Sequence, residues 1–462
     1  MLLRPLKSVV FAVLGVLPAV LSAQTPPLPA TLPEDFFPGL RNILLAALQQ
    51  SPQMILHNLD LAAQEANRYQ AASGLWPSVG GGASYGADQS MVSVSNLPRT
   101  PVAQSYVYSF GVSQPVYHWG ALQAAADISH LQIAVSEHQY AQAYAQLAMM
   151  LRSQYLSLIA QKVQLRNAYR GLDETKSSVA VVEDRFKNAA ATADDVTLAH
   201  LQLDDANLSI DRTTENFAHT KRMFLLMAGL SELKDDDIPD EIPPPVYSAD
   251  TVEALLKNFE SGGLHDTFQS KVYNDQIKES ELNYKIAKYR LYPRVDLQLG
   301  VNQQNQSQVN GSTVAQNQVF TDSIGIGASW SIFDGFATRG AKLAALTSKR
   351  QAERNLQTYL DQTMEQARES ERQLVFSARA LAIAEQRFKL REEALQRAKD
   401  NFKLHTLSQA GMDQATAGFD QAQAAIFGAR ADFLASWSGY LSLLNVDPVL
   451  NNLPTRFTNN AK

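Results

Sequence analysis

The sequence contains no cysteine, and this absence removes several kinds of chemistry at once. It excludes disulfides, thiol nucleophiles, zinc sites with cysteine ligands and the lipid-acceptor cysteine of a bacterial lipoprotein. A strong net charge is also lacking, at −6, so no basic field predicts nucleic-acid binding. The eight histidines form no paired-ligand motif, and no phosphate-binding, dinucleotide-binding or serine-hydrolase motif is present. We therefore expect no enzyme activity, metal or cofactor.

The sequence also lacks an apolar run long enough to span a membrane as a helix. The best candidate, Val9–Leu21, has about 13 residues, whereas a spanning helix needs roughly 20. This run follows Arg4 and Lys7 and precedes the small pair Ser22-Ala23, which is typical of a secretory signal peptide. We predict that residues 1–23 direct export, and that any membrane crossing by the rest of the chain uses strands.

The chain repeats itself at a spacing of 216 residues. Leu75-Trp76-Pro77-Ser78-Val79 returns as Leu291-Tyr292-Pro293-Arg294-Val295. Because this spacing holds without a gap over about 150 residues, it predicts two structural copies, 40–230 and 253–446. A short extension, 24–39, precedes them and a tail, 447–462, follows. Further pairs at this spacing are Tyr117 with Phe333, Phe186 with Phe402, Asp204 with Asp420, Ala206 with Ala422, and Leu225 with Leu441.

A linker rich in acids and prolines, residues 231–252, separates the two copies. Pro243-Pro244-Pro245 forbids helix there, and Asp235-Asp236-Asp237 favours contact with water. The acidic run could form a cation site or simply be a solvated linker. We favour the solvated linker.

Apolar residues recur every seven positions in both copies. A strict heptad drifts by about 20° per repeat on a straight helix, so packing partners must supercoil left-handedly. The remaining positions are rich in good helix formers. The first stripe comprises Tyr144, Leu151, Leu158, Leu165, Leu172, Val179 and Phe186, and the second comprises Leu360, Ala367, Leu374, Leu381, Phe388, Leu395 and Phe402.

These stripes predict helices over Ala121–Lys187 and Ala337–Leu404, each roughly 100 Å long at 1.5 Å rise per residue. After short breaks at 189–193 and 405–410, a second helix returns in each copy. Each copy thus contains a long pair of antiparallel helices. Taken alone, this pattern also fits an ordinary coiled-coil stalk.

Strand patterns favour a membrane protein over a stalk. Residues 295–302 and 323–332 alternate apolar with Gly, Ser, Gln, Asn or Asp, and 105–113 does so with one exception. Residues 79–87 alternate more weakly. We predict one β-hairpin per copy, about 79–117 and 294–333, with polar loops at 88–104 and 302–321. Such strands fit a membrane barrel with a polar lumen better than a β-sandwich packed on one side.

Four strands cannot close a membrane barrel, because such barrels have at least eight strands and open edges are not tolerated in lipid. Two copies would supply eight strands and three would supply twelve. Eight strands leave an interior filled by side chains, whereas twelve leave a pore. Export through the barrel therefore favours three copies.

The order of these elements resembles the TolC-like outer-membrane efflux family over nearly the whole chain beyond the signal peptide. No single motif is specific, but the order recurs in both copies. The matching residues are Leu75-Trp76-Pro77-Ser78, Gln114-Pro115-Val116-Tyr117, Ser331-Ile332-Phe333-Asp334-Gly335, and Arg185-Phe186 followed by Asp195-Val196 and Ala199.

The resemblance implies a mixed, mainly α fold and a homotrimer, with a 12-stranded barrel in outer-membrane lipid continuous with a 12-helix periplasmic tunnel. It also implies a periplasmic adaptor protein and an inner-membrane pump of the RND, ABC or MFS type as partners. The pump would supply the energy, and the channel would conduct passively through a gate. Two alternatives stay open: type I protein secretion and a non-conducting exported coiled-coil structural protein.

The helix tips and nearby acids are the candidate site residues. The tips, Ala189-Ala190-Ala191-Thr192 and His405-Thr406-Leu407-Ser408, are small or uncharged and fit adaptor docking or a simple turn. Asp194, Asp195 and Asp413 fit a periplasmic gate that favours cations, or acids that stabilise a helix start. The family often has glycine where Ala189 and His405 stand. Gly411 and Gln414 occupy positions of its aspartate ring, so Asp195 is the better gate candidate.

Overall fold

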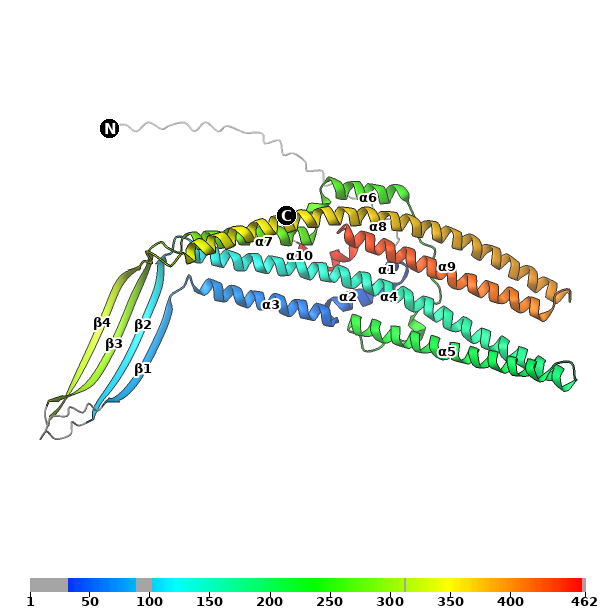
Figure 1. The fold of residues 1–462 in the computed structure, drawn as a ribbon, viewed down its shortest axis with the longest axis horizontal. Coiled ribbons are helices and arrows are strands. Elements are labelled where there is room, and N and C mark those ends of the chain that lie inside the picture. The colour runs from blue at the N-terminus through cyan, green and yellow to red at the C-terminus, as the bar shows by residue number, and fades with distance from the viewer. Residues whose placement is uncertain (1–31, 89–101, 311–312, 459–462) are drawn as a thin grey trace, which may run out of the picture.

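The computed structural model describes residues 32–88, 102–310 and 313–458, so the predicted signal peptide lies outside the described residues. A curved four-stranded sheet lies at one end and long helices extend from it (Figure 1). The first elements are α1 (Pro33–Phe36), α2 (Pro38–Gln50), α3 (Pro52–Ser73), β1 (Ser78–Asp88), β2 (Ala103–Tyr117), α4 (Ala121–Lys187), α5 (Ala193–Ala228) and the 3₁₀ turn η1 (Asp235–Asp237). They are followed by α6 (Ala249–Ser261), η2 (Gly263–Asp266), α7 (Phe268–Lys288), β3 (Arg294–Asn310), β4 (Thr313–Ser329), α8 (Ala337–Lys403), α9 (Gln409–Leu443), η3 (Pro448–Asn452) and α10 (Thr455–Thr458).

The two long helices form where the heptad stripes predicted them. α4 and α8 each contain 67 residues. Their stripes are buried along most of the length, with Leu151, Leu158 and Leu374 fully inaccessible. Phe186 and Phe402, at the far ends, are exposed. None of the described helices combines the length and apolarity needed to cross a membrane.

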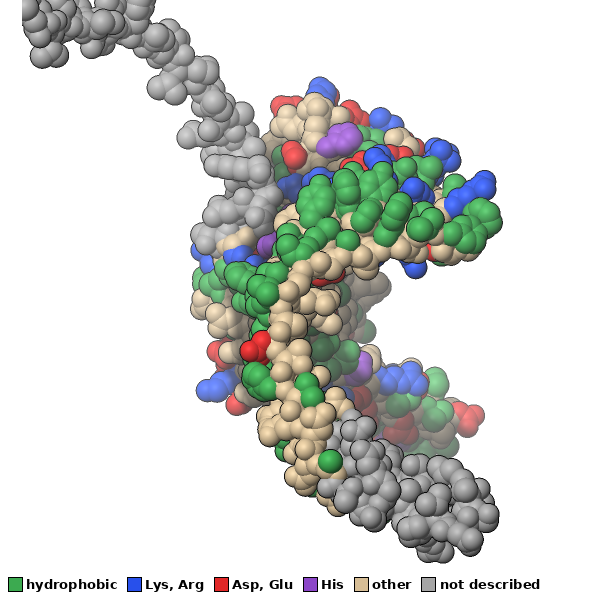
Figure 2. All heavy atoms as spheres, turned by 90° about the vertical axis from the view of Figure 1, so that its left-hand side faces the viewer, with side chains coloured by type: hydrophobic (Ala, Val, Ile, Leu, Met, Phe, Trp, Pro, Cys, Tyr) green, Lys and Arg blue, Asp and Glu red, His purple; other side chains and the backbone are tan. Residues whose placement is uncertain are grey.

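The helices form a wall with α4 inside it and α8 at one edge. Near the sheet the packing order is α3, α4, α7, α8, and toward the tips it is α5, α4, α9, α8. The opposite edge is therefore formed by α3 and α5. Viewed along its length, the molecule is a curved arc that is hollow on one side (Figure 2).

The sheet is antiparallel throughout, in the order β1-β2-β3-β4. β1 and β4 are its edge strands, each with a single neighbour among the described residues. The hairpins of the two copies are joined through β2 and β3, which pair from Ser105 with Gln306 to Tyr117 with Val295 and are interrupted by a bulge at Pro115.

Two details of the predicted hairpins were wrong. The expected loop 302–321 is mostly strand, because β3 and β4 pair as far as Asn310 with Thr313. Gln, Asn and Ser side chains hid these strands, although their backbone pairing does not need apolar residues. Trp330 and Ile332 lie beyond the end of β4. The middle of the other predicted loop, 89–101, lies outside the described residues.

The linker between the copies is not fully solvated, which corrects the sequence interpretation. Ile238 and Ile242 are buried against the helices. Lys162 of α4 donates to the carbonyl oxygens of Asp235 and Ile238, at 2.9 and 2.6 Å, and Arg430 of α9 donates to that of Ile242 at 2.7 Å. α6 also begins inside the expected linker. The segment is thus fastened to the middle of the wall.

The backbone itself obeys the 216-residue repeat. Left-handed backbone is unfavourable for residues with a Cβ, and glycine is the residue that adopts it freely. All eight described residues with such φ angles, between +56° and +76°, fall into four repeat-related pairs. Two of these pairs belong to the strand-to-helix turns, where two consecutive residues are left-handed. Glycine is the second of these two residues in the first copy and the first of them in the second copy. The pairs are Trp119 with Gly335, Gly120 with Phe336, Ala189 with His405, and Gly229 with Asn445.

Candidate functional site

The strand register gives the sheet two chemically different faces. Gly80, Gly111, Gly300 and Ser323 lie opposite one another across the four strands, and a hollow lies over this polar face. The other face carries an equally continuous apolar row, formed by Val79, Val112, Leu299 and Ile324. The apolar face is open in the single chain, with Ile324 78% and Ile326 74% exposed. Such a sheet suits lipid on one side and water on the other.

Repeat-related hydrogen bonds fix the sheet to the helices. The amide of Gln114 donates to the carbonyl oxygen of Leu75 at 3.1 Å, and the indole of Trp330, 216 residues later, donates to that of Leu291 at 2.9 Å. Trp119 adds a bond to the carbonyl oxygen of Pro293 at 2.8 Å. These contacts join the ends of the strands to the turns that follow α3 and α7.

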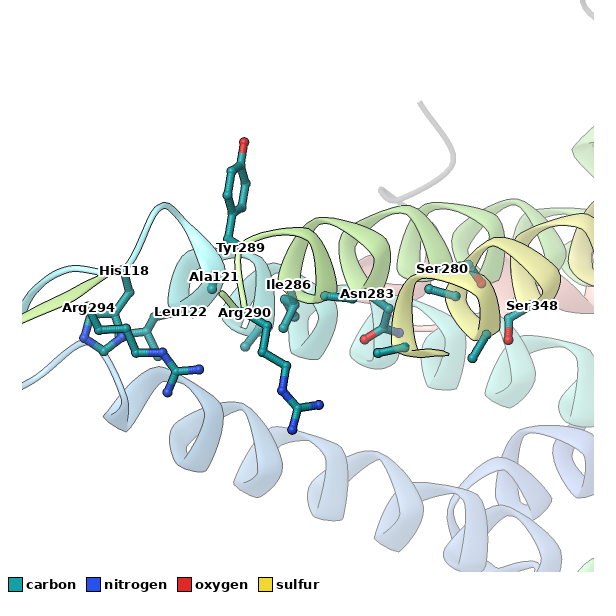
Figure 3. Close-up of a pocket in the computed structure, with 15 residues that line it drawn as sticks. His118, Ala121, Leu122, Ser280, Asn283, Ile286, Tyr289, Arg290, Arg294 and Ser348 are labelled. Atoms are coloured by element: carbon teal, nitrogen blue, oxygen red, sulfur yellow. The ribbon is translucent and has the colours of Figure 1, made fainter. Parts of the chain in front are cut away.

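A cavity of about 830 Å³ lies at this junction, between the ends of α4, α7 and α8. Arg290, Arg294 and His118 point into it, whereas Tyr289 points the other way (Figure 3). His118 Nε2 lies 2.8 Å from Asp296 Oδ1. The lining is therefore mainly apolar along the helices, with two arginines and a histidine at the end nearest the sheet.

The first helix tip is closed by a capping box. The hydroxyl oxygen of Thr192 accepts from the backbone N–H of Asp195 at 3.2 Å, and the Asp195 carboxylate accepts from the backbone N–H of Thr192 at 2.8 Å. These hydrogen bonds lower the pKa of Asp195. Ala189, at φ +56°, makes the turn before the cap. Asp194 lies beside this cap, in the first turn of α5.

The second tip repeats the turn but lacks the box. His405 takes the left-handed backbone of Ala189, and Ser408 accepts from the N–H of Gly411 at 3.3 Å. Gly411 stands where the first copy has Asp195, so the second tip has no carboxylate at this position to accept a hydrogen bond from the backbone N–H of Ser408. Leu407 packs directly over Gly411, and a Cβ there would lie 2.6 Å from its Cδ1. α9 starts at Gln409, slightly earlier than predicted.

The structure places Asp413 away from the first-turn position of Asp194 and Asp195. It accepts from Gln409 at 2.7 Å and faces Glu174 on α4. Burial, followed by the charges of Asp413 and Asp420, raises the pKa of Glu174. Arg170 Nη1 donates to Asp420 Oδ1 at 2.6 Å, which joins α4 to α9. No group of acids and histidines in the described residues is arranged to hold a metal ion.

Sequence reasoning missed a buried ion cluster at the middle of α4. Arg152 is fully inaccessible and donates to Glu34 of α1 at 2.8 Å, to Ser438 of α9 at 2.9 Å, and to Asp447 beyond α9 at 2.9 Å. Burial alone lowers the pKa of Arg152, but the bonds and charges of Asp447 and Glu34 outweigh it and raise that pKa. Arg152 therefore binds both end segments to the wall.

The repeat partner of Arg152 is Arg368 on α8. It donates to Glu260 of α6 at 3.2 Å and to Glu365 at 2.8 Å. Its side chain is 45% exposed. Both copies thus use the same arginine to hold an added segment, but only the first copy buries it.

The sequence matches the family described as outer membrane efflux protein over residues 43–219 and 275–445. The chain belongs to this family, as the resemblance implied. It is accordingly an outer-membrane efflux channel protein and not an enzyme. No curated protein sequence matches it closely enough to count as a relative.

Solved structures share the fold at low sequence identity. The CmeC outer membrane channel of Campylobacter jejuni is 15% identical, with a TM-score of 0.69 and coverage of 93% of this chain and 94% of that one. VceC of Vibrio cholerae is 17% identical (TM-score 0.62, coverage 88% and 96%). The open-state MtrE channel of Neisseria gonorrhoeae is 13% identical (TM-score 0.64, coverage 88% and 88%). The mainly helical fold with a small antiparallel sheet is therefore common to these channels.

Proposed function

We propose that three copies of this chain form the outer-membrane exit duct of a tripartite export system. Their sheets would close a 12-stranded barrel, and their helices would form a 12-helix tunnel below it. The observation that carries this proposal is the two-faced sheet with open edges at β1 and β4. Unpaired edges are not tolerated in lipid, so copies must pair with one another. Each copy would contribute the two repeats 40–230 and 253–446.

Transport through the duct would be passive and gated at the tips. A periplasmic adaptor would bind Ala189–Thr192 and His405–Ser408, and an inner-membrane pump of the RND, ABC or MFS type would supply energy. To open the gate, the adaptor must bind the open arrangement more tightly than the closed one. Asp195, Asp194 and Asp413 are the proposed acids of the mouth. Type I protein secretion is the alternative use of the same duct.

Planar-bilayer recording tests the proposal against a non-conducting exported structural protein. The purified protein should run as a trimer in detergent and give discrete ion conductance. A monomer that adds no current to the bilayer would refute the channel.

Charged substitutions at the tips test adaptor docking. We expect Ala190→Glu or Leu407→Glu to abolish export while trimers persist, because the tips lie at the far end of the helices from the strands that would close the barrel. A matched control is Asp194→Glu, which leaves the local charge unchanged. Normal export by both charged variants would remove the tips as the docking site.

A further inference from the structure

The cavity at the junction of sheet and helices combines an apolar wall with two positive charges. Arg290 and Arg294 point into it from the end nearest the sheet (Figure 3). None of the described residues that line it is acidic. Its volume of about 830 Å³ lies within the usual range of small-molecule sites, about 300–1,000 Å³. The apolar wall comprises Ala121, Leu122 and Ala125 of α4, Ile286 and Ala287 of α7, and Ala341, Ala344 and Ala345 of α8.

Neither guanidinium group has a partner within the described part of the chain. Arg290 and Arg294 make no side-chain hydrogen bond or ion pair there, and both are exposed. Asp296, on the same strand as Arg294, is already bound to His118. Asp334 is close enough to Arg290 to interact with it electrostatically, but its carboxylate accepts from the backbone at the start of α8 at 2.9 Å. Both arginines therefore retain donors for a carboxylate, sulfonate or phosphate group.

The fold does not require arginine at either position. Subtracting 216 residues gives Gly74 in place of Arg290 and Ser78 in place of Arg294. β1 begins at Ser78, as β3 begins at Arg294, so the first copy makes the same turn into its strand with small residues. The basic pair is thus an addition of the second copy, present once in each chain.

The strand register places the basic pair on the polar face of the sheet. Arg294 and Asp296 belong to the alternate positions of β3 that include Gly300, whereas Val295 lies between them on the apolar face. In the proposed channel the polar face lines the water-filled passage. The arginines would therefore meet molecules that move through the passage, and not the lipid outside it.

We propose that this cavity binds amphiphilic organic anions on their way through the channel. The anionic group would lie against Arg290 and Arg294, and the apolar body would lie against the alanine-rich wall. This inference deepens the proposed channel and rests on it, because the polar face becomes a passage only in that assembly. Two arginines from each of three copies would raise the local concentration of anions at this level. The junction would thus favour anions, whereas the acids proposed for the mouth favour cations.

Three probes separate the charge from the apolar body. Naphthalenesulfonate carries both, naphthalenesulfonamide keeps the body without the charge, and methanesulfonate keeps the charge without the body. Calorimetric titration of the purified assembly in nonionic detergent, with the detergent alone as a blank, measures their binding. We expect naphthalenesulfonate to bind about tenfold or more tighter than either other probe. Equal binding of the neutral sulfonamide would overturn the anion site.

Substitutions locate the binding. Arg290→Gln with Arg294→Gln should weaken naphthalenesulfonate binding by about tenfold or more and leave that of the sulfonamide unchanged. The matched control is Lys288→Gln, because Lys288 lies over the ring of Tyr289, which points away from the cavity. An equal loss in this control would reduce the effect to overall charge and overturn the site. Ala125→Phe should fill the apolar part and weaken naphthalenesulfonate binding but not that of methanesulfonate.

An anionic lipid headgroup carries the same chemistry as the head of an organic anion. Phosphatidylglycerol added to the detergent should not displace naphthalenesulfonate, because the arginines lie on the polar face of the sheet. Displacement would assign the cavity to lipid and overturn the proposed occupant.

Bilayer recording separates failure of the site from failure of the channel. Naphthalenesulfonate should reduce the single-channel current of the wild type, and reduce that of the double arginine variant less. A protein that conducts without binding the probe, or whose block ignores the arginines, overturns the site and leaves the channel standing. A protein that does not conduct refutes the proposed function. If the double variant does not assemble, Arg290→Gln alone, in the turn before β3, tests the same site, and unchanged binding by it is equally decisive.

Discussion

Replacing Arg152 should destabilise the protein far more than replacing its repeat partner Arg368. In Arg152→Ala the carboxylates of Glu34 and Asp447 remain in the wall without their cation. Removing one partner of a buried ion cluster costs about 3–5 kcal/mol. Arg368 is 45% exposed, and an ion pair at such a site contributes about 0–1 kcal/mol. The repeat thus supplies a matched control within the same chain.

Urea unfolding, followed by tryptophan fluorescence, measures the difference. Trp437 is buried on α9, one residue before Ser438, so its contribution to the emission reports unfolding of this part of the helical wall. We expect the midpoint of Arg152→Ala to fall well below that of Arg368→Ala at equal protein concentration. Near-equal midpoints would refute the reasoning, because burial would then have no effect on the energy of the cluster.

Neutral replacement of the whole cluster gives a second check. Arg152→Met combined with Glu34→Gln and Asp447→Asn leaves no unpaired charge. Because a buried ion pair gains little over well-packed neutral residues, the triple variant should recover much of the lost stability. A triple variant as unstable as Arg152→Ala would show that the loss comes from packing and not from charge.

Three shorter predictions concern the tips and the helix contact. Ala189→Gly should slow hydrogen exchange at the first tip by relieving left-handed strain, a net gain of about 0.5–1 kcal/mol, whereas Ala190→Gly should not. Glu174 has a raised pKa, so its contribution to stability is present at low pH and is lost as pH rises through that pKa. Glu174→Gln should therefore unfold at a higher temperature than wild type at pH 7.5 and at a similar one at pH 4. Asp195→Asn should weaken the cation preference of single channels, and an unchanged preference would assign this carboxylate to capping alone.

The features predictable from the sequence were those with a period. The heptad pattern predicted α4 and α8, because a long packed helix needs a continuous apolar stripe. The alternation of apolar and polar residues predicted the apolar parts of the hairpins. The extension of β3 to Asn310 was missed because its Gln and Asn residues have no apolar alternation. Pairing of these polar residues depends on the neighbouring strand, which a local pattern does not report.

Arg152 was missed for a different reason. An arginine in a helix is typical of a solvent-exposed surface, and the partners of Arg152 lie 118 and 295 residues away in the sequence. Ile238 and Ile242 were similarly hidden among acids and prolines. Whether such residues are buried depends on which other segments of the chain pack against the long helices. A repeat predicts the wall, but it does not predict the segments added to it.

The equal lengths of α4 and α8 restrict how the molecule can change in size. Both helices have 67 residues, so the two tips end at the same depth below the sheet. Removing one heptad from α4 and the matching turns from α5 would withdraw one tip by about 10 Å and leave the other in place. A shorter or longer version of this protein with both tips at the same depth therefore requires the same number of whole heptads to be removed from, or added to, α4 and α8.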